Sequence, residues 1–330
     1  MLISIIIPVY NAAPYLEEAL NSTLNQSYRH LEIIIIDDGS TDGSDKICDR
    51  YAEKDERIHV IHQNNRGLSN ARNKGLDLAT GQMIVFLDAD DSYSINYVEA
   101  MLEAMIKNSS DMVICKYSVH RTLSKMEWED ASKGYPSINP GMYDRRSSLR
   151  ALADGSLNHS VWNKMYKREL WENIRFPEGK VYEDVATTFQ IISRCKTVFV
   201  KEESLYLHRN RNDSISSTLS KSNIVDYIEA YSHFEHYIRV NIPDVFSEQQ
   251  LQKCLYCRLK RMMGYSISIL LQRDTYQKDL YCVLRKNLLE IGSNVDIKGC
   301  GSRTRICRWM ICYCPWLTKV AYQIYSKIMV

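Results

Sequence analysis

Residues 83–91 read Met83-Ile84-Val85-Phe86-Leu87-Asp88-Ala89-Asp90-Asp91, an apolar run followed by a cluster of carboxylates. An uninterrupted apolar run of this length is typical of a short strand buried on both faces of a sheet. Asp88 and Asp90 are two positions apart, so in extended chain both side chains project to the same side, where their oxygens can share one hard divalent cation. Such a cation would neutralise a diphosphate. The alternative is that Asp90 or Asp91 caps the helix expected from about Ile95, but a cap needs only one acid.

Apolar strands alternate with amphipathic helices through the first 110 residues. Several runs rich in β-branched residues predict central strands, and each run ends in polar residues. The expected strands cover 2–9, 31–36, 58–62 and 83–87, and the expected helices begin near Pro14 and cover 68–79 and 95–107. This alternation predicts an α/β fold in which helices flank a mostly parallel, Rossmann-like sheet on both faces.

Ligands of parallel sheets bind beyond the carboxyl ends of the strands, so the polar residues at these ends should converge on one crevice. They are Tyr10, Asp38, Asn65 and Asp88. No G-x-G-x-x-G follows the first strand and no G-x-x-x-x-G-K-[ST] occurs in the sequence, which argues against a dinucleotide dehydrogenase and a P-loop NTPase. The net charge of +2 is too small to argue for nucleic acid as a partner.

The pattern beyond residue 110 is less regular and then becomes helical. The expected elements are a strand over 112–119, a loop over 124–146, a helix over 183–193, strands near 197–201 and 205–207, and a basic loop over 208–213. Long segments of 3.6-residue period follow near 225–239, 248–271 and 276–289. We therefore expect a domain of residues 1–220, with halves 1–110 and 111–220, and a helical C-terminal region of residues 221–330.

The cysteines and the amino terminus indicate a reducing compartment. Ten cysteines without a secretory leader predict reduced thiols in a cytoplasmic protein. Cys254-x-x-Cys257 suggests a zinc site, but the pair lies inside an expected helix and lacks a second pair at regular spacing, so buried thiols are favoured. No apolar run reaches the ~20 residues that a membrane-spanning helix needs.

Four blocks in the first 120 residues resemble, in order and spacing, those of the GT-A fold, family 2 inverting glycosyltransferases. The blocks are Ser4-Ile5-Ile6-Ile7-Pro8-Val9-Tyr10-Asn11, Asp37-Asp38-Gly39-Ser40-Thr41-Asp42, Ala71-Arg72-Asn73-Lys74-Gly75 and Phe86-Leu87-Asp88-Ala89-Asp90-Asp91. Weaker similarity to bacterial cell-surface polysaccharide enzymes continues to about residue 218, through Trp162-Asn163-Lys164 and Glu183-Asp184. The last hundred residues carry no motif that would assign a family. The resemblance implies a GT-A domain with a nucleotide-sugar donor and a Mn²⁺ or Mg²⁺ cofactor, since an all-oxygen site suits either ion.

The resemblance also implies roles for the donor residues. Asp90 resembles the family's direct metal ligand, and Asp88 its partner at the ribose and the metal. Asp38 resembles the carboxylate that accepts a hydrogen bond from the imide N–H of the base, which favours uracil; the alternative is a turn or helix cap. Tyr10 would stack on the base and Pro8 would fix the turn beneath it, unless both simply pack at the strand end.

Four further positions resemble residues near the nucleotide. Arg72 and Asn65 lie in blocks that face the same crevice, although an exposed helix arginine is often only solvated. His208 resembles a residue that completes the metal shell or bonds a phosphate, and Arg209 and Arg211 beside it suit anion binding. Lys164 could reach the donor or the acceptor.

An inverting transfer also needs a base that accepts the proton of the attacking hydroxyl. Asp184, in the pair Glu183-Asp184 at the start of a helix, resembles the family's catalytic base. Burial beside Glu183 would raise its pKa above the ~3.9 of a free aspartate. The alternative is a pair of acids that the helix dipole stabilises.

The end of the chain is cationic. Residues 297–330 contain six basic residues and no acidic one, and residues 303–330 include five aromatic residues. Such a segment suits peripheral contact with the anionic inner face of the cell membrane, where a lipid-linked acceptor would be presented. The alternatives are packing against residues 252–271 or a homodimer contact.

Together these features predict a metal-dependent inverting glycosyltransferase that moves a sugar from a UDP-sugar to a hydroxyl of a glycan or lipid-linked acceptor in surface polysaccharide biosynthesis. The competing class is a protein of the same fold that binds a nucleotide or glycan without turnover, which the intact Asp88, Asp90 and Asp184 argue against. A sugar-nucleotide pyrophosphorylase would need a Gly-rich basic loop after the first strand, and Asn11-Ala12-Ala13-Pro14 provides none.

Overall fold

The computed structural model describes residues 1–120, 137–210, 220–243, 278–294 and 302–315, together with single positions between these runs. The chain divides into two compact units, one formed by residues 1–152 and 156–212 and the other by residues 153–155 and 213–330. The candidate site residues named above belong to the first unit.

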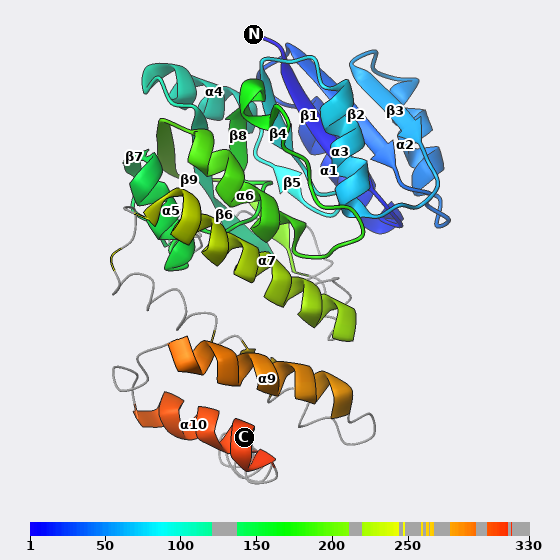
Figure 1. Cartoon of the computed structure of the whole chain (residues 1–330). Coiled ribbons are helices and arrows are strands. Elements are labelled where there is room, and N and C mark those ends of the chain that lie inside the picture. The colour runs from blue at the N-terminus through cyan, green and yellow to red at the C-terminus, as the bar shows by residue number, and fades with distance from the viewer. Residues whose placement is uncertain are drawn as a thin grey trace. The chain divides into compact units, whose positions relative to one another are not determined.

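Within the described residues, nine strands form one sheet in the order β3-β2-β1-β4-β8-β6-β9-β5, and β7 pairs with β9. The strands are β1 (Ile3–Val9), β2 (Leu31–Asp37), β3 (Ile58–His62), β4 (Met83–Phe86), β5 (Ser92–Tyr93), β6 (Met112–His120), β7 (Gly141–Asp144), β8 (Lys164–Lys167) and β9 (Thr197–Arg209). Strands β1 to β4 pair in parallel, as predicted, so their carboxyl ends lie at one edge (Figure 1). Strand β8 runs antiparallel between β4 and β6, which makes the sheet mixed.

Helices cover both faces of the sheet. The helices of the first unit are α1 (Ala13–Leu24), α2 (Ser44–Ala52), α3 (Leu68–Leu78), α4 (Tyr97–Lys107), α5 (Arg145–Ala153) and α6 (Glu183–Arg194), with a short 3-10 helix η1 (Arg168–Trp171). Ile3, Ile5 and Ile7 of β1 pack in one core with apolar residues of α1 and α4. Ile6 faces the other side, where a Cβ at Gly75 of α3 would overlap its side chain. The alternation along β1 thus seats helices on opposite faces, and the predicted α/β class is confirmed.

The turn between α3 and β4 is held by one carboxylate. Glu32 of β2 accepts hydrogen bonds from the Ser4 hydroxyl and from the backbone N–H groups of Thr80 (2.6 Å) and Gly81 (2.8 Å). Burial alone would raise the pKa of Glu32, but these hydrogen bonds lower it. A Cβ at Gly81 would lie 2.7 Å from Ser4 Oγ and 2.8 Å from the carbonyl oxygen of Leu2, so this close approach requires glycine.

Asp111 connects β6, β8 and β9 at the other end of the sheet from the acidic cluster. Its carboxylate accepts hydrogen bonds from Lys167 Nζ (2.6 Å) and from the backbone N–H groups of Lys196 (2.7 Å) and Thr197 (3.2 Å). Burial would raise the pKa of Asp111, but these hydrogen bonds and the charge of Lys167 lower it. The ionised carboxylate therefore stabilises the fold.

Three predicted elements differ from the structure. The loop expected over 124–146 ends in β7, which pairs with β9, and in the first residues of α5; residues 124–136 lie outside the described part. The two strands and the start of the basic loop expected over 197–213 form one continuous strand, β9, so His208 and Arg209 are strand residues. The helix after the acidic cluster begins at Tyr97 and not at Ile95.

The second unit is helical in its described parts. It contains α7 (Lys221–Asn241), α9 (Lys278–Asn294) and α10 (Ser302–Tyr313). The helices predicted near 225–239 and 276–289 correspond to α7 and α9, whereas the one predicted over 248–271, with Cys254 and Cys257, falls largely outside the described residues. Among the described residues, no helix combines the length and apolar character needed to cross a membrane.

Candidate active site

The acids after β4 differ in burial and in partners. Asp91 is 1% exposed and accepts hydrogen bonds from Tyr206 Oη (2.6 Å) and from the backbone N–H of Arg209 (2.7 Å). Burial raises the pKa of Asp91, and its hydrogen bonds only oppose this effect. Asp88 and Asp90 are half-buried. Asn96 is the residue that precedes α4, and no side chain caps that helix, so the capping alternative is wrong. Asp91 instead ties the loop of Asp88 and Asp90 to the end of β9.

Arg72 of α3 joins two acids that are far apart in the sequence. It is 3% exposed; Nη2 donates to Asp88 Oδ1 at 2.8 Å, and Nη1 donates to Glu183 Oε1 at 2.5 Å. Its guanidinium also lies over the ring of Phe176, 5.5 Å from the centroid. Burial alone would lower the pKa of Arg72, but the charges of Asp88 and Glu183 raise it. Arg72 is therefore a buried cation, and the alternative of a solvated helix residue is wrong.

Glu183 and Asp184 open α6, after Tyr182 in a left-handed conformation at φ 62°. Asp184 Oδ1 accepts the backbone N–H of Val185 at 2.7 Å. Burial raises the pKa of both acids; the charge of Arg72 opposes the rise in each, and that of Asp88 increases it for Asp184. The charges of Asp88 and Arg72 thus act on the Asp184 carboxyl group, which places the three side chains in one electrostatic cluster.

Lys164 of β8 is completely buried, and its hydrogen bonds to described residues are made to neutral oxygens. Its Nζ donates to Asn158 Oδ1 (3.0 Å), Asn163 Oδ1 (2.9 Å) and the carbonyl oxygen of Ser160 (2.5 Å). Burial lowers the pKa of Lys164 to about 7, although Cys115 and Asp184 favour the charged form. Because an ammonium has three donors, these bonds use all of them. In its ammonium form, Lys164 therefore holds the segment 158–163.

His208 is fixed by an aromatic stack and by Asp91. The ring of Trp162 stacks on His208 (5.1 Å between centroids, 10°) and on Tyr206 (4.4 Å, 25°). His208 Nδ1 lies 3.2 Å from Asp91 Oδ2, so Nε2 is the ring nitrogen that would meet a ligand. Burial would lower the pKa of His208, but the hydrogen bond and charge of Asp91 and the charges of Asp88 and Asp90 raise it. The imidazole therefore lies beside the acidic cluster.

Arg209 has a different role from the one expected. Its Nε donates to the carbonyl oxygen of Asp90 (3.0 Å), its Nη2 donates to Glu18 (2.8 Å), and its guanidinium lies over the ring of Tyr15, 5.0 Å from the centroid. At 6% exposure this side chain holds the acidic loop against α1, so the expectation that it binds an anion does not hold. Arg211 lies outside the described residues.

The residues expected at the base surround the ends of β1 and β2. Pro8 is buried within β1 and pairs with Ile36, while the Tyr10 side chain, 52% exposed, follows the strand. Asp38 accepts hydrogen bonds from Gln63 Nε2 (2.8 Å) and from the backbone N–H groups of Arg66 (2.9 Å) and Gly67 (2.7 Å). Asp38 therefore shapes the loop that contains Asn65, whose side chain is exposed.

The structure thus forms two groups. Arg72 links Asp88 directly to Glu183, and charge interactions include Asp90, Asp184 and His208 in this first group. Asp38 and its loop form the second, at the adjoining strand ends.

The first group suits a divalent cation. Among the described residues, no cluster of three or more His, Cys, Asp or Glu side chains forms a complete metal site. Mg²⁺, however, is commonly held by one or two carboxylates together with substrate phosphates. Asp88 and Asp90 supply hard oxygen donors, and the raised pKa of His208 reflects the negative charge gathered there. The donor set therefore fits Mg²⁺ or Mn²⁺.

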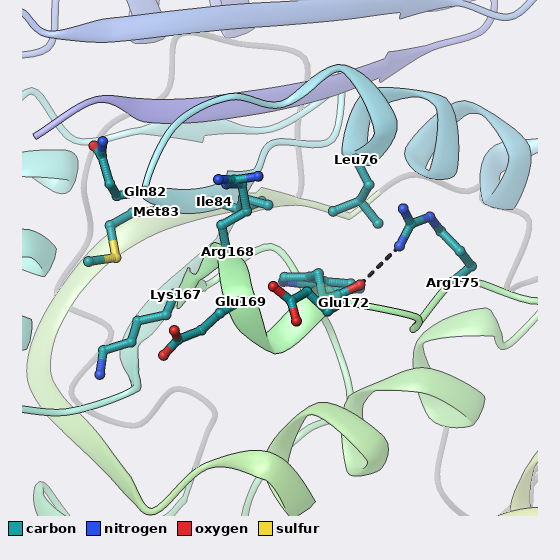
Figure 2. A pocket seen from close by; sticks show the side chains of 10 residues that line it. Leu76, Gln82, Met83, Ile84, Lys167, Arg168, Glu169, Glu172 and Arg175 are labelled. Carbon is teal, nitrogen blue, oxygen red and sulfur yellow. Dashed lines mark hydrogen bonds between the residues drawn. The ribbon is translucent and has the colours of Figure 1, made fainter.

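A cavity of about 580 Å³ lies elsewhere, at the opposite end of β4 (Figure 2). Met83 and Ile84 of β4, Lys167 of β8 and Arg168 of η1 line it, and Arg175 donates from Nη1 to the carbonyl oxygen of Trp171 beside it (2.9 Å). None of the candidate site residues lines this cavity.

Sequence reasoning missed the roles of several residues. Asp91 was considered only as a cap, Glu183 only as a neighbour of Asp184, and Trp162 only as part of a motif. One signal in the sequence could have indicated a separate role for Asp91, because Asp88 and Asp90 already provide the two carboxylates that would share a cation. No local signal connects Arg72 with Glu183, because 111 positions separate them.

Comparisons with known proteins identify the family of this chain. The family model described as Glycosyl transferase family 2 matches residues 4–175. TuaG of Bacillus subtilis (strain 168), a glycosyltransferase named for teichuronic acid biosynthesis, is 35% identical over 67% of this chain and 84% of its own. Across such relatives, the matched region spans between 34% and 84% of their length.

Two solved structures share the fold. Residues 1–349 of S. aureus TarS, in complex with UDP-GlcNAc, align with a TM-score of 0.73 at 19% identity and cover 98% of this chain and 92% of that one. The mannosyltransferase PcManGT of Pyrobaculum calidifontis, in complex with GDP-Man and Mn²⁺, aligns with a TM-score of 0.52 at 16% identity and covers 98% and 87%. From the family match, the relatives and the architecture together, we conclude that this chain belongs to glycosyl transferase family 2 and has the GT-A fold.

Proposed function

We propose that this protein is an inverting glycosyltransferase that moves a sugar from a UDP-linked donor to a hydroxyl of a surface glycan or lipid-linked saccharide. The observation that carries the proposal is the buried network in which Arg72 joins Asp88, on the donor side, to Glu183, the neighbour of the candidate base. TuaG supports a role in surface polysaccharide synthesis, and the TarS complex with UDP-GlcNAc is consistent with a UDP donor.

On the donor side, Asp88 and Asp90 would hold Mg²⁺ or Mn²⁺, and His208 would complete the shell or bond a phosphate. Enzymes of this family often use such ions, and PcManGT was solved with Mn²⁺. A bound ion stabilises the departing diphosphate as a Lewis acid, without proton transfer. Arg72 fixes the position of the Asp88 carboxylate by the 2.8 Å hydrogen bond.

On the acceptor side, Asp184 takes the proton of the attacking hydroxyl. Burial raises the pKa of Asp184, which makes its carboxylate a stronger base than an exposed aspartate. Attack from the face opposite the leaving group inverts the anomeric centre. Glu183 is held away from this role, because its Oε1 binds Arg72.

At the nucleotide end, Asp38, Asn65, Tyr10 and Pro8 would form the site for the base. A carboxylate has about four acceptor positions, and Asp38 uses three of them on the loop that follows β3, which leaves one for an imide N–H. Residues 1–220 would form the catalytic domain, with donor and acceptor halves 1–110 and 111–220, and residues 221–330 the helical region. Action at the cytoplasmic face of the membrane and assembly as a homodimer stay predictions.

The test is release of UDP from UDP-GlcNAc and related donors, with and without Mn²⁺, followed by mass analysis of glycan products and NMR of the anomeric configuration. Asp184→Asn should lower kcat by about 10²–10⁴-fold, the usual contribution of a general base. Asp90→Ala should abolish the increase in UDP release that Mn²⁺ produces in the wild type. Asp77→Asn is the matched control, because Asp77 forms an exposed ion pair with Arg175 outside the site. Donor binding by thermal shift without release of UDP would favour the non-catalytic alternative, and undiminished transfer by Asp184→Asn would reject the assigned base.

A further inference from the structure

Helix α10 of the second unit has one face fixed to α9 and an apolar face exposed to solvent. On the inner side, Ile311 is completely buried and Cys312 is 2% exposed. The carbonyl oxygen of Ile311 accepts a hydrogen bond from Tyr281 Oη, and that of Cys312 accepts one from Arg285 Nε at 2.6 Å. Arg308 Nε donates in turn to the carbonyl oxygen of Leu288 at 3.3 Å. These contacts fix the rotation of α10 about its axis.

The opposite side presents Ile306, Trp309 and Tyr313, which are 57%, 52% and 57% exposed. They stand at spacings of three and four residues and so form one stripe along the helix. The rings of Trp309 and Tyr313 lie next to each other, with centroids 6.5 Å apart. We define these three residues as the α10 stripe. A contiguous group of exposed large apolar residues often marks an interaction site.

The sign of the charge selects the occupant. Arg305 is exposed beside Ile306. In the sequence, residues 297–330 contain six basic residues and no acidic one. A second copy of this face would bring like charges together, which is costly. An anionic surface would be complementary. Aromatic side chains with flanking basic residues are the composition of helices that lie in the headgroup region of a bilayer.

We propose that the α10 stripe docks the protein on an anionic lipid surface. At 12 residues the helix is about 18 Å long, too short to span a bilayer, so it lies in the plane of the interface. The inference goes beyond the proposed sugar transfer and holds or fails separately from it. It also goes beyond the cationic tail seen in the sequence, because it names the face and the residues that enter the headgroups.

The test is co-sedimentation of the 330-residue chain with vesicles of phosphatidylcholine, alone or mixed with phosphatidylglycerol, in the absence of any donor. We expect binding to the anionic vesicles that falls with salt. Trp309→Ser should weaken binding about 10- to 150-fold, which is the fold-change that corresponds to the about 1.5–3 kcal/mol gained by burial of a large apolar side chain. Arg305→Gln should weaken it about fivefold on anionic vesicles only, at about 1 kcal/mol per basic residue.

The matched control is Val240→Ser on α7, which removes an apolar side chain that is 61% exposed but away from the stripe and should leave binding unchanged. Circular dichroism of each variant checks that the helices remain folded. Equal binding of wild type and the double variant Trp309→Ser, Tyr313→Ser would overturn the proposal. The proposal would also be overturned if the protein bound neither kind of vesicle and instead formed a dimer that the double variant dissociates. UDP release measured without vesicles reports on the proposed transfer independently.

Discussion

Arg72→Lys is the substitution whose consequence follows most directly from the geometry. The guanidinium reaches two carboxylates with two different nitrogens, Nη2 to Asp88 at 2.8 Å and Nη1 to Glu183 at 2.5 Å. Lysine keeps the positive charge but has a single nitrogen on a flexible stem, so it cannot hold both acids in their present positions. The variant therefore separates the charge of Arg72 from its forked shape.

The magnitude follows from the loss of one hydrogen bond between charged groups. Such a bond contributes about 1.5–3 kcal/mol, so kcat/KM for the donor should fall about 10- to 150-fold in Arg72→Lys. Initial rates of UDP release measure this change, and circular dichroism at the assay temperature confirms that the variant is folded. Release of the Asp88 bond should appear mainly in the donor KM, and release of the Glu183 bond mainly in kcat.

Arg66→Lys is the matched control, because Arg66 is 63% exposed and its ion pair with Glu178 is long at 3.5 Å. Exposed pairs contribute little, so this variant should behave as wild type. If Arg72→Lys also retained the wild-type kcat/KM, the two carboxylates would not need a common cation, and the bridge between donor and acceptor sides would have no functional role.

Three further predictions concern pH and stability. Burial raises the pKa of Asp184, so kcat/KM should rise with pH along a limb centred above the ~3.9 of free aspartate; a limb at or below that pH would contradict the assignment. Asp111→Asn should lower the free energy of unfolding by about 1.5–3 kcal/mol at pH 7, while the exposed Asp77→Asn should change it by less than about 1 kcal/mol. Because the folded pKa of Asp111 is lowered, its contribution is present above the unfolded pKa of ~3.9 and disappears as pH falls through the folded value, which urea titrations across acidic pH would show. Gly81→Ala should cost about 1–3 kcal/mol in thermal melts, since the new Cβ meets Ser4 Oγ at 2.7 Å; an unchanged melting temperature would contradict the contact.

The fold of residues 1–110 could be predicted because its strands are buried on both faces. Runs such as Ile33 to Ile36 contain no polar residue, so the sequence shows a buried strand directly. The parallel pairing of these strands brings their carboxyl ends together, as expected. Strand β9 was divided in the prediction because Glu202 and Glu203 in its middle are exposed and read as a break. Strand β7 was missed because the surrounding stretch is polar and rich in Gly and Pro, and because the strand is only four residues long.

The candidate site could be predicted only in part, for a different reason. The family blocks pointed to Asp88, Asp90 and Asp184, but the role of each neighbouring side chain depends on contacts across more than a hundred positions. Which of three successive acids turns inward is decided by Tyr206 and by the backbone N–H of Arg209. Spacing along the chain contains no information on that choice.

The place of β8 between β4 and β6 limits how the protein can be shortened. A fragment that stopped near residue 110 would retain the first four parallel strands but would lose Lys164–Lys167, which cover one side of β4. That side would then present unpaired backbone groups next to four completely apolar residues, Met83–Phe86, an arrangement that recruits strands from other molecules. Recombinant fragments of residues 1–110 should therefore accumulate as aggregates, and a workable truncation must extend past residue 167.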